Sequence, residues 1–549
     1  MLFGGTLIII HLITIRSIFN KCMITMSNYV KNLRELQDAR INLAILFLVA
    51  LGVTIFHILF HEPWRDETQT YLVAIAPQTW SSFSDFMHRI LQENHPPLPY
   101  LLMGFLSFIT GAPYLTAIFG GAGYFIVLTG LYRYLLTSGG SRILSMILTL
   151  MTASTYVVAY EYGVIARSYG IGIGLIFWGL SFLEEKDGLS GRHFLAAAFC
   201  FSLAGSSNLM AAILAGSILL ISSITRCKYI GSLNLLGGWL IFLPVVILHY
   251  IISFFGYGRG SISNVTEVIQ RHFADLPRFF DFNWQLIQKV LAPMGFWQVP
   301  FDGIFAKLAA QLLLLAVASA TGYALFFSNL RRRILSLIGA AVLSGLLLNV
   351  VYAIYLGSVR HHFHLIVIPL ALLCHLLVKR GELPRIVRDP AVCFMSIYWL
   401  LGFYGVIYSM VNDAQHSFSQ TKQVADRVAY GATIIPKRES VTTSLKYHRP
   451  DVKLLSSRFG PFTFMPWDKA GRPTPMLVDK YTKLACATGK PVYFVGSPFK
   501  NANLNQKKLG CISEVPLEKE KIRAGTQEYF GLHLADCDCW MTNERTASK

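Results

Sequence analysis

The sequence predicts a polytopic α-helical membrane protein followed by a small external α/β domain. Of the 549 residues, 54% are hydrophobic and only 14% are charged, whereas a soluble domain carries about 25% charged residues. A soluble core could not bury this much apolar surface, so much of it must face lipid. The character of the chain changes after Met410, beyond which no long apolar run occurs.

Eleven apolar runs are long enough, or nearly so, to cross a bilayer, for which a helix needs roughly 17–25 residues. The runs are 41–60, 113–131, 143–160, 169–183, 193–203, 209–224, 230–252, 304–327, 334–356, 363–378 and 391–410. Two of these runs, 193–203 and 209–224, are expected to form a short hairpin. One further run, Leu98–Thr110, is also short, and we expect it to lie in the membrane interface.

The placement of Leu98–Thr110 in the interface brings the basic connectors, such as "NLRRR" and "KRGELPRIVRD", to one side of the membrane. The positive-inside rule assigns that side to the cytoplasm. We therefore expect the N-terminus inside and the C-terminus outside. The net charge of +18 is then an orientation signal, and nucleic-acid binding is not expected.

Three regions follow from this topology. Residues 1–40 form a cytoplasmic segment, residues 41–411 form the transmembrane domain with an external loop over 61–112, and residues 412–549 form an external soluble domain. In the last region, "SQTKQVADRVAYG" predicts an amphipathic helix and "KPVYFVG" predicts a buried strand.

The external region also carries four cysteines, Cys486, Cys511, Cys537 and Cys539. An even number of cysteines in an oxidising compartment suggests two disulfides, for which three connectivities exist. The close "CDC" pair could instead bind metal, but no second pair nearby completes a zinc site.

The stretch "HEPWRDETQTY" presents two adjacent carboxylates, Asp66 and Glu67, directly after the first span. The residues from Asp66 onward predict an amphipathic helix held against the bilayer. Neighbouring residues on a helix point about 100° apart, so we expect only one of the two carboxylates to face a site. The alternative is that both simply end a span in a solvated loop.

Two more polar segments fall on the same external side. "ENHPPLPY" fixes His95 at the start of the interfacial helix, because prolines delay the next helix. "YEYGVIARSYG" carries Glu161 and Arg167 at the two ends of a predicted loop, followed by Tyr169. An external arginine runs against the positive-inside trend, and a guanidinium binds phosphate with two parallel bonds. An arginine that reaches toward lipid headgroups is the alternative.

The fourth external segment, "GSVRHHFH", contains Arg360, His361, His362 and His364. A short histidine cluster without a carboxylate at helical spacing is weak evidence for metal. We expect Arg360, His361 and His362 to contact a phosphate instead. No metal site and no cofactor are expected; the sequence allows a divalent cation but does not indicate one.

The middles of the spans contain no Asp, Glu or Arg. An ion-coupled transporter places ionisable groups or broken helices near the bilayer midplane. Here the polar residues gather at one interface instead. This pattern is typical of an enzyme that acts on a lipid headgroup.

The Asp66-Glu67 pair after the first span, followed by "E-x-H-P-P-L-x-Y" and "A-R-x-Y", resembles the GT-C glycosyltransferases over roughly residues 41–370. The branch in question contains the protein O-mannosyltransferases and the lipid A aminoarabinose transferases. The resemblance implies an inverting sugar transfer from a polyprenyl-phosphate donor to an acceptor hydroxyl. It also implies that Asp66 is the general base and that Arg167, Tyr169 and Arg360 lie near the carrier phosphate.

Some positions depart from that pattern. Gln69 stands where the aminoarabinose transferases have a basic residue, and Asn208 stands where related sequences often have a histidine. No trefoil domain of the eukaryotic enzymes is present, which favours a bacterial inner membrane with the site facing the periplasm. The sugar and the acceptor, whether glycan, lipid or protein, stay open. The alternatives are a lipid-linked oligosaccharide polymerase or ligase and, less favoured, a flippase or transporter.

Overall fold

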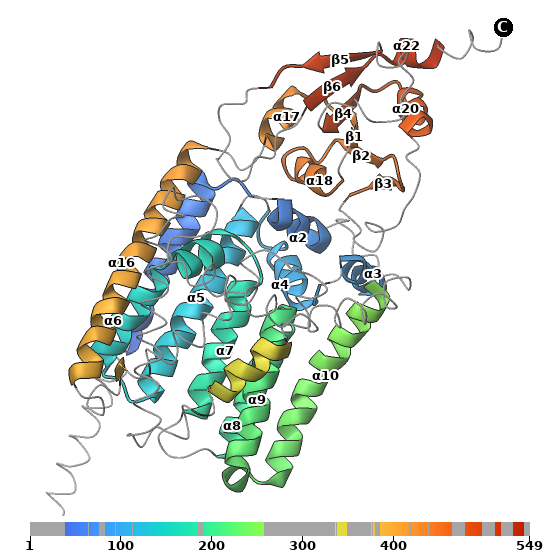
Figure 1. Ribbon diagram of the computed structural model, residues 1–549. Helices are drawn as coiled ribbons and strands as arrows, with labels where there is room; N and C mark the ends of the chain where they lie inside the picture. Colours follow the sequence, from blue (N-terminus) through green and yellow to red (C-terminus); the bar gives the residue numbers. More distant parts are fainter. Residues whose placement is uncertain are drawn as a thin grey trace, which may run out of the picture. The chain divides into compact units, whose positions relative to one another are not determined.

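Figure 1 shows a computed structural model of the chain. The structure describes most of residues 39–256, a helix at 338–347 with a few positions around it, and most of residues 385–542. The expected span 304–327 and most of 363–378 lie outside the described residues, as do Arg360, His361 and His362. The chain divides into two compact units, residues 1–51 and 52–549. The site described below lies within the second unit.

Long apolar helices confirm a membrane protein. Among the described residues, four helices are long and apolar enough to cross a membrane, and a bent pair would make a fifth. The four are Ala39–Phe60, α5 (Tyr114–Thr137), α9 (Leu209–Ile230) and the part of α10 (Ser232–Gly256) that ends at His249. Three more helices cover other expected runs, namely α7 (Tyr169–Leu183), α8 (Gly191–Gly205) and α16 (Arg385–Gln415).

The expected span 143–160 consists of two helices with a bend between them. Helix α6 (Arg142–Ala153) stops, and a π-helix, η1 (Tyr156–Val164), continues at an angle of 69°. The hydroxyls of Ser154 and Thr155 donate to carbonyl oxygens of the preceding turn, at 2.8 and 2.7 Å. Such side-chain bonds compete with the helical ladder, and Thr155 leaves it for an extended conformation.

Glycines allow α5 and α7 to pack closely. A methyl group at Gly174 would lie 2.6 Å from the backbone nitrogen of Val127, and one at Gly130 would lie 2.5 Å from the Gly174 carbonyl oxygen. Neither position has room for a side chain. Gly130 and Gly174 therefore serve helix packing.

Three short helices lie at one end of this bundle: α2 (Arg65–Ile75), α3 (Phe83–Glu93) and α4 (Leu98–Leu106). They share a buried apolar core with the start of α5 and with Ala166 and Ile171. With nine residues, α4 is too short to cross a bilayer. These helices hold the polar segments of the first loop against the bundle.

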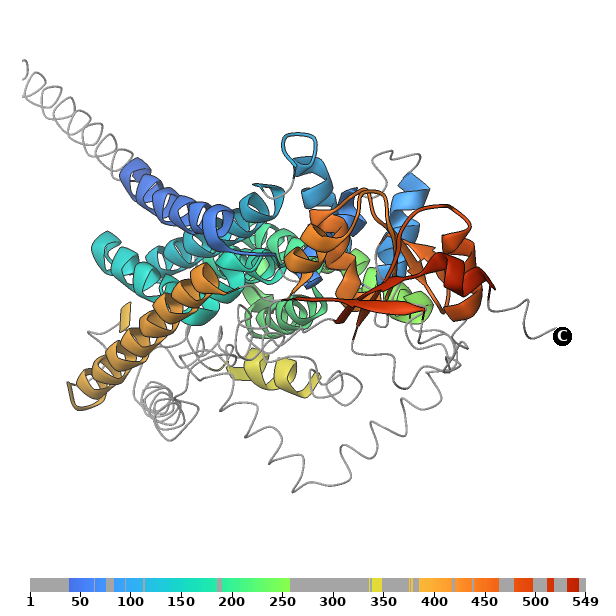
Figure 2. The ribbon, with the colours of Figure 1, turned by 90° about the horizontal axis from the view of Figure 1, so that it is seen from above.

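The C-terminal region forms an α/β domain, as expected. Six strands among the described residues of this region form one sheet in the order β3-β2-β1-β4-β6-β5, drawn in orange to red in Figures 1 and 2. The central strand β1 (Thr433–Pro436) is parallel to β2 (Lys453–Ser456) and β4 (Val492–Gly496). The strands β3 (Gly460–Phe462), β6 (Gly531–Ala535) and β5 (Ile512–Val515) are antiparallel to their neighbours. The expected strand "KPVYFVG" is β4.

Helices cover both faces of this sheet. Ile434 joins one core with residues of α17 (Thr421–Arg427) and α18 (Glu439–His448). The next residue, Ile435, joins the other core with α20 (Val478–Cys486) and α22 (Cys537–Thr542), because successive strand residues point to opposite faces. The two expected disulfides are present, and they pair Cys486 with Cys537 and Cys511 with Cys539.

Candidate active site

The first turn of α2 carries both carboxylates. The first span ends at Phe60, and Pro63 follows before α2 starts at Arg65. Proline cannot continue the ladder of the preceding helix. Acidic residues in the first turn of a helix are favoured by its dipole, and Asp66 and Glu67 occupy this turn.

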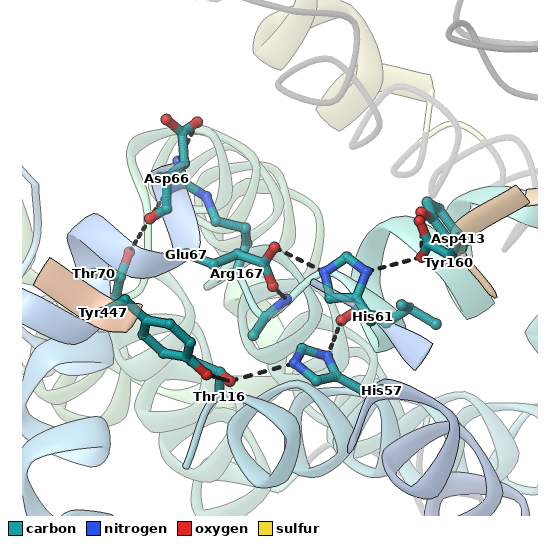
Figure 3. Close-up of polar contacts among 12 residues, drawn as sticks. His57, His61, Asp66, Glu67, Thr70, Thr116, Tyr160, Arg167, Asp413 and Tyr447 are labelled. Carbon is teal, nitrogen blue, oxygen red and sulfur yellow. Dashed lines mark hydrogen bonds and ion pairs between the residues drawn. The ribbon is translucent and has the colours of Figure 1, made fainter. Parts of the chain in front are cut away.

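Asp66 lies beside Arg167, which comes from the segment between η1 and α7 (Figure 3). The guanidinium is 3.6 Å from the Asp66 carboxylate and also donates to the Asp66 backbone carbonyl oxygen at 2.9 Å. It lies over the Tyr169 ring, 5.8 Å from its centre. The Asp66 side chain is 22% exposed and the Arg167 side chain is 12% exposed, so a substrate could reach both.

Glu67 points the other way and is fully buried. One carboxylate oxygen accepts the backbone N–H of Ala166 at 2.6 Å, and the other lies 3.0 Å from Nε2 of His61. The two neighbours therefore have different surroundings, as expected from their angular separation on a helix.

His61 joins α2 to α16 (Figure 3). Its Nδ1 donates to the carboxylate of Asp413 at 2.8 Å, and the hydroxyl of Tyr160 donates to the same oxygen at 2.7 Å. Burial alone would lower the pKa of His61. The carboxylates of Glu67 and Asp413 outweigh it and raise this pKa to about 10, because nearby negative charge favours the imidazolium.

His95 and Glu93 lie next to this centre. His95 Nδ1 donates to the Glu93 backbone carbonyl oxygen at 2.7 Å, and the His95 side chain is 47% exposed. The buried Glu93 carboxylate accepts from the amide of Gln69 at 2.6 Å. Gln69, which departs from the aminoarabinose transferase pattern, thus ties α2 to α3.

Glu161 differs from the sequence prediction in its surroundings. It lies within the π-helix rather than at the edge of a loop, and it is 2% exposed. Its carboxylate accepts the Tyr156 hydroxyl at 2.8 Å. The local cause is the break at Thr155, which turns this segment inward. The structure thus brings together Asp66, Glu67, Arg167 and Tyr169, with Glu161 in the protein interior.

Three buried residues were missed by the sequence analysis: His57, His61 and Asp413. The first two are spaced four residues apart near the end of a helix, a spacing that places both imidazoles on one face. That signal was available in the sequence. Asp413 is 352 residues from His61, and no local pattern connects them.

Two further features border this centre. A pocket of about 500 Å³ is lined by His61, Glu62, Asp413, Lys422 and His448, among others. On α18, the Tyr447 ring packs edge-on against Tyr71 of α2 with the centres 5.2 Å apart. The α/β domain therefore contacts the helix that carries the two carboxylates.

Comparisons with known proteins fit this architecture. No protein-family model and no curated protein matches the sequence. In structure, the chain is similar to ArnT from Cupriavidus metallidurans in the apo state, with a TM-score of 0.53, 13% identity, and 91% of this chain and 99% of that chain covered. Likeness at this identity establishes the fold. The chain is a membrane protein with the GT-C fold, similar to ArnT over nearly its whole length.

Two other solved structures are similar to the chain at lower TM-scores. The oligosaccharyltransferase of Archaeoglobus fulgidus gives a TM-score of 0.45 at 12% identity, covering 83% of this chain and 68% of that one. The arabinofuranosyltransferase AftD from Mycobacteria gives 0.44 at 15%, covering 90% of this chain and 41% of that one.

Proposed function

We propose that the protein is an inverting glycosyltransferase that moves a sugar from a polyprenyl-phosphate donor to an acceptor hydroxyl. The observation that carries this proposal is the pair formed by Asp66 and Arg167, 3.6 Å apart and partly exposed at one end of an apolar helix bundle. Such a site combines a proton acceptor, Asp66, with a phosphate-binding residue, Arg167. Both lie where a donor with its lipid tail in the bilayer could reach them.

Each residue has a chemical part in this reaction. Asp66 takes the proton of the acceptor hydroxyl while the oxygen of that hydroxyl bonds to the anomeric carbon. The bond from that carbon to the phosphate breaks, and its electron pair leaves with the polyprenyl phosphate. Arg167 stabilises the negative charge that builds up on the departing phosphate. One displacement from the opposite face inverts the anomeric centre.

Neighbouring residues complete the proposed donor site. Tyr169 supports the Arg167 guanidinium through its ring face, and the exposed His95 side chain can bond a substrate oxygen. Arg360, His361 and His362 are proposed as further phosphate partners from the sequence. The Glu67 carboxylate is buried, so we propose that Glu67 affects catalysis indirectly, by holding α2 in position.

The proposed location is a bacterial inner membrane, with the site and the α/β domain facing the periplasm. The two disulfides of the α/β domain support an oxidising compartment for this domain. The positive-inside rule supports the same orientation.

Binding of undecaprenyl phosphate to the purified protein tests the donor class. Arg167→Ala should weaken binding about 10- to 100-fold, because a hydrogen bond to a charged group contributes about 1.5–3 kcal/mol. Arg192→Ala, at the start of α8, is the matched control and should bind like the wild type. A wild type that does not bind, or equal binding by both variants, would overturn the proposal.

A further inference from the structure

We propose that His57, His61 and Glu67 form a binding site for one divalent transition-metal ion, with zinc as the metal that best suits these donors. The three residues are buried, and their ligand atoms lie within 4.8 Å of one another. His57 and His61 are four residues apart, and the His61 backbone N–H bonds to the His57 carbonyl oxygen. Two histidines and one carboxylate are a common zinc ligand set.

The hydrogen bonds around the two histidines favour this role. Nδ1 of His57 lies 2.6 Å from the Val164 carbonyl oxygen, and a carbonyl can only accept. This nitrogen therefore carries the proton, and Nε2 of the neutral ring keeps its lone pair, which accepts from the Thr116 hydroxyl at 3.3 Å and would turn to the ion instead. Nδ1 of His61 likewise donates to Asp413 at 2.8 Å. Metal-bound histidines almost always donate their other ring N–H to a carbonyl or carboxylate in this way.

The third ligand is held in the same manner. One oxygen of Glu67 accepts the backbone N–H of Ala166 at 2.6 Å. The other oxygen faces Nε2 of His61 at 3.0 Å, in the space where the ion would sit (Figure 3). All three ligands are thus oriented by a second contact before any ion binds, which lowers the cost of ordering them.

The charges of the cluster also favour a divalent cation. Glu67 and Asp413 bring two negative charges to a buried place. A divalent ion bound to the two histidines and to Glu67 balances both charges. Buried charge is tolerated when it is paired in this way.

His61 and Asp413 line the pocket of about 500 Å³, and we propose this pocket as the route by which the ion enters. Once bound, it would join the end of the first span to the first turn of α2. Asp66 is the residue next to Glu67, so the ion would fix the position of the proposed base without contacting the donor. This inference goes beyond the proposed function and does not depend on it.

Cobalt substitution tests the site in the full-length protein. The chain is purified, stripped with a chelator and titrated with Co²⁺, and the visible absorption of the bound ion is recorded. One ion per chain should bind, and zinc should displace it. His57→Ala should abolish the signal, while the control His193→Ala, at the start of α8, should keep it. Asp413→Asn should lower the affinity for zinc about 10- to 100-fold.

A ligand exchange keeps the test decisive if His57→Ala does not fold. His57→Cys retains a donor, so it should still bind Co²⁺ and add a thiolate-to-cobalt charge-transfer band. The proposal is overturned if the wild type gives no cobalt spectrum. It is equally overturned if His57→Ala and His57→Cys both give the wild-type spectrum.

Discussion

The two carboxylates in the first turn of α2 have different surroundings: that of Asp66 is 22% exposed beside Arg167, and that of Glu67 is buried between Ala166 and His61. The helix itself separates them, because adjacent residues point about 100° apart. From this difference we propose separate tasks for the two carboxylates. Asp66 faces the proposed reaction, and Glu67 anchors the helix that presents it.

The largest expected effect comes from Asp66→Asn. Loss of a general base lowers the rate about 10²- to 10⁴-fold. The isosteric amide should lower the thermal unfolding midpoint only slightly, because the ion pair with Arg167 is partly exposed. The measurement is turnover of short-chain polyprenyl-phosphate sugars, followed by release of polyprenyl phosphate. Full activity in this variant would remove Asp66 as the base.

Glu67→Gln should lower the thermal stability of the protein. The amide cannot carry the charge that pairs with His61, and removing one partner of a buried ion pair costs about 3–5 kcal/mol. The midpoint of thermal unfolding should fall well below that of Asp66→Asn. If Glu67→Gln and Asp66→Asn melted alike, the division of tasks between the two carboxylates would be wrong.

The imidazolium of His61 gives the metal-free protein a pH dependence. Its pKa rises from 6.5 to about 10 in the folded state, so its contribution is present below pH 6.5 and disappears as the pH rises toward 10. The loss is on the order of 4 kcal/mol, since one pKa unit corresponds to about 1.4 kcal/mol. Thermal unfolding of chelator-treated protein between pH 6 and 10 measures it.

The control for this pH dependence is His61→Gln, which lacks the titrating group. Its unfolding midpoint should be lower at pH 6 and should change less as the pH rises. Parallel curves for the wild type and the variant would assign the pH dependence to other groups.

The smallest effect is expected for Tyr447→Phe, at the contact between the α/β domain and α2. The Tyr447 hydroxyl lies 3.5 Å from that of Thr116, and such a bond contributes about 1 kcal/mol or less. The ring contact with Tyr71 stays intact. A shift of the unfolding midpoint as large as that of Glu67→Gln would show that this contact, rather than the ion pair, holds α2.

Local patterns predicted much of this molecule. Composition and apolar runs predicted the membrane helices, the strand at β4 followed from its continuous apolar run, and the GT-C fold followed from the motifs around Asp66 and Arg167. Each of these signals lies within a short stretch of sequence.

Tertiary features were not predictable in this way. The π-helix that buries Glu161 follows a break at which the hydroxyls of Ser154 and Thr155 donate to backbone carbonyl oxygens, and apolar content alone cannot reveal this break. The partnership of His61 with Asp413 joins residues 352 positions apart. It exists only once α16 packs beside η1.

The most direct measurement is a cryo-electron-microscopy structure of the purified protein with bound undecaprenyl phosphate. We expect the phosphate within hydrogen-bond reach of the Arg167 guanidinium, on the Asp66 side of α2, with the lipid tail along the apolar helices. A phosphate bound away from Arg167, or on the Glu67 side of α2, would contradict the proposed division between the two carboxylates.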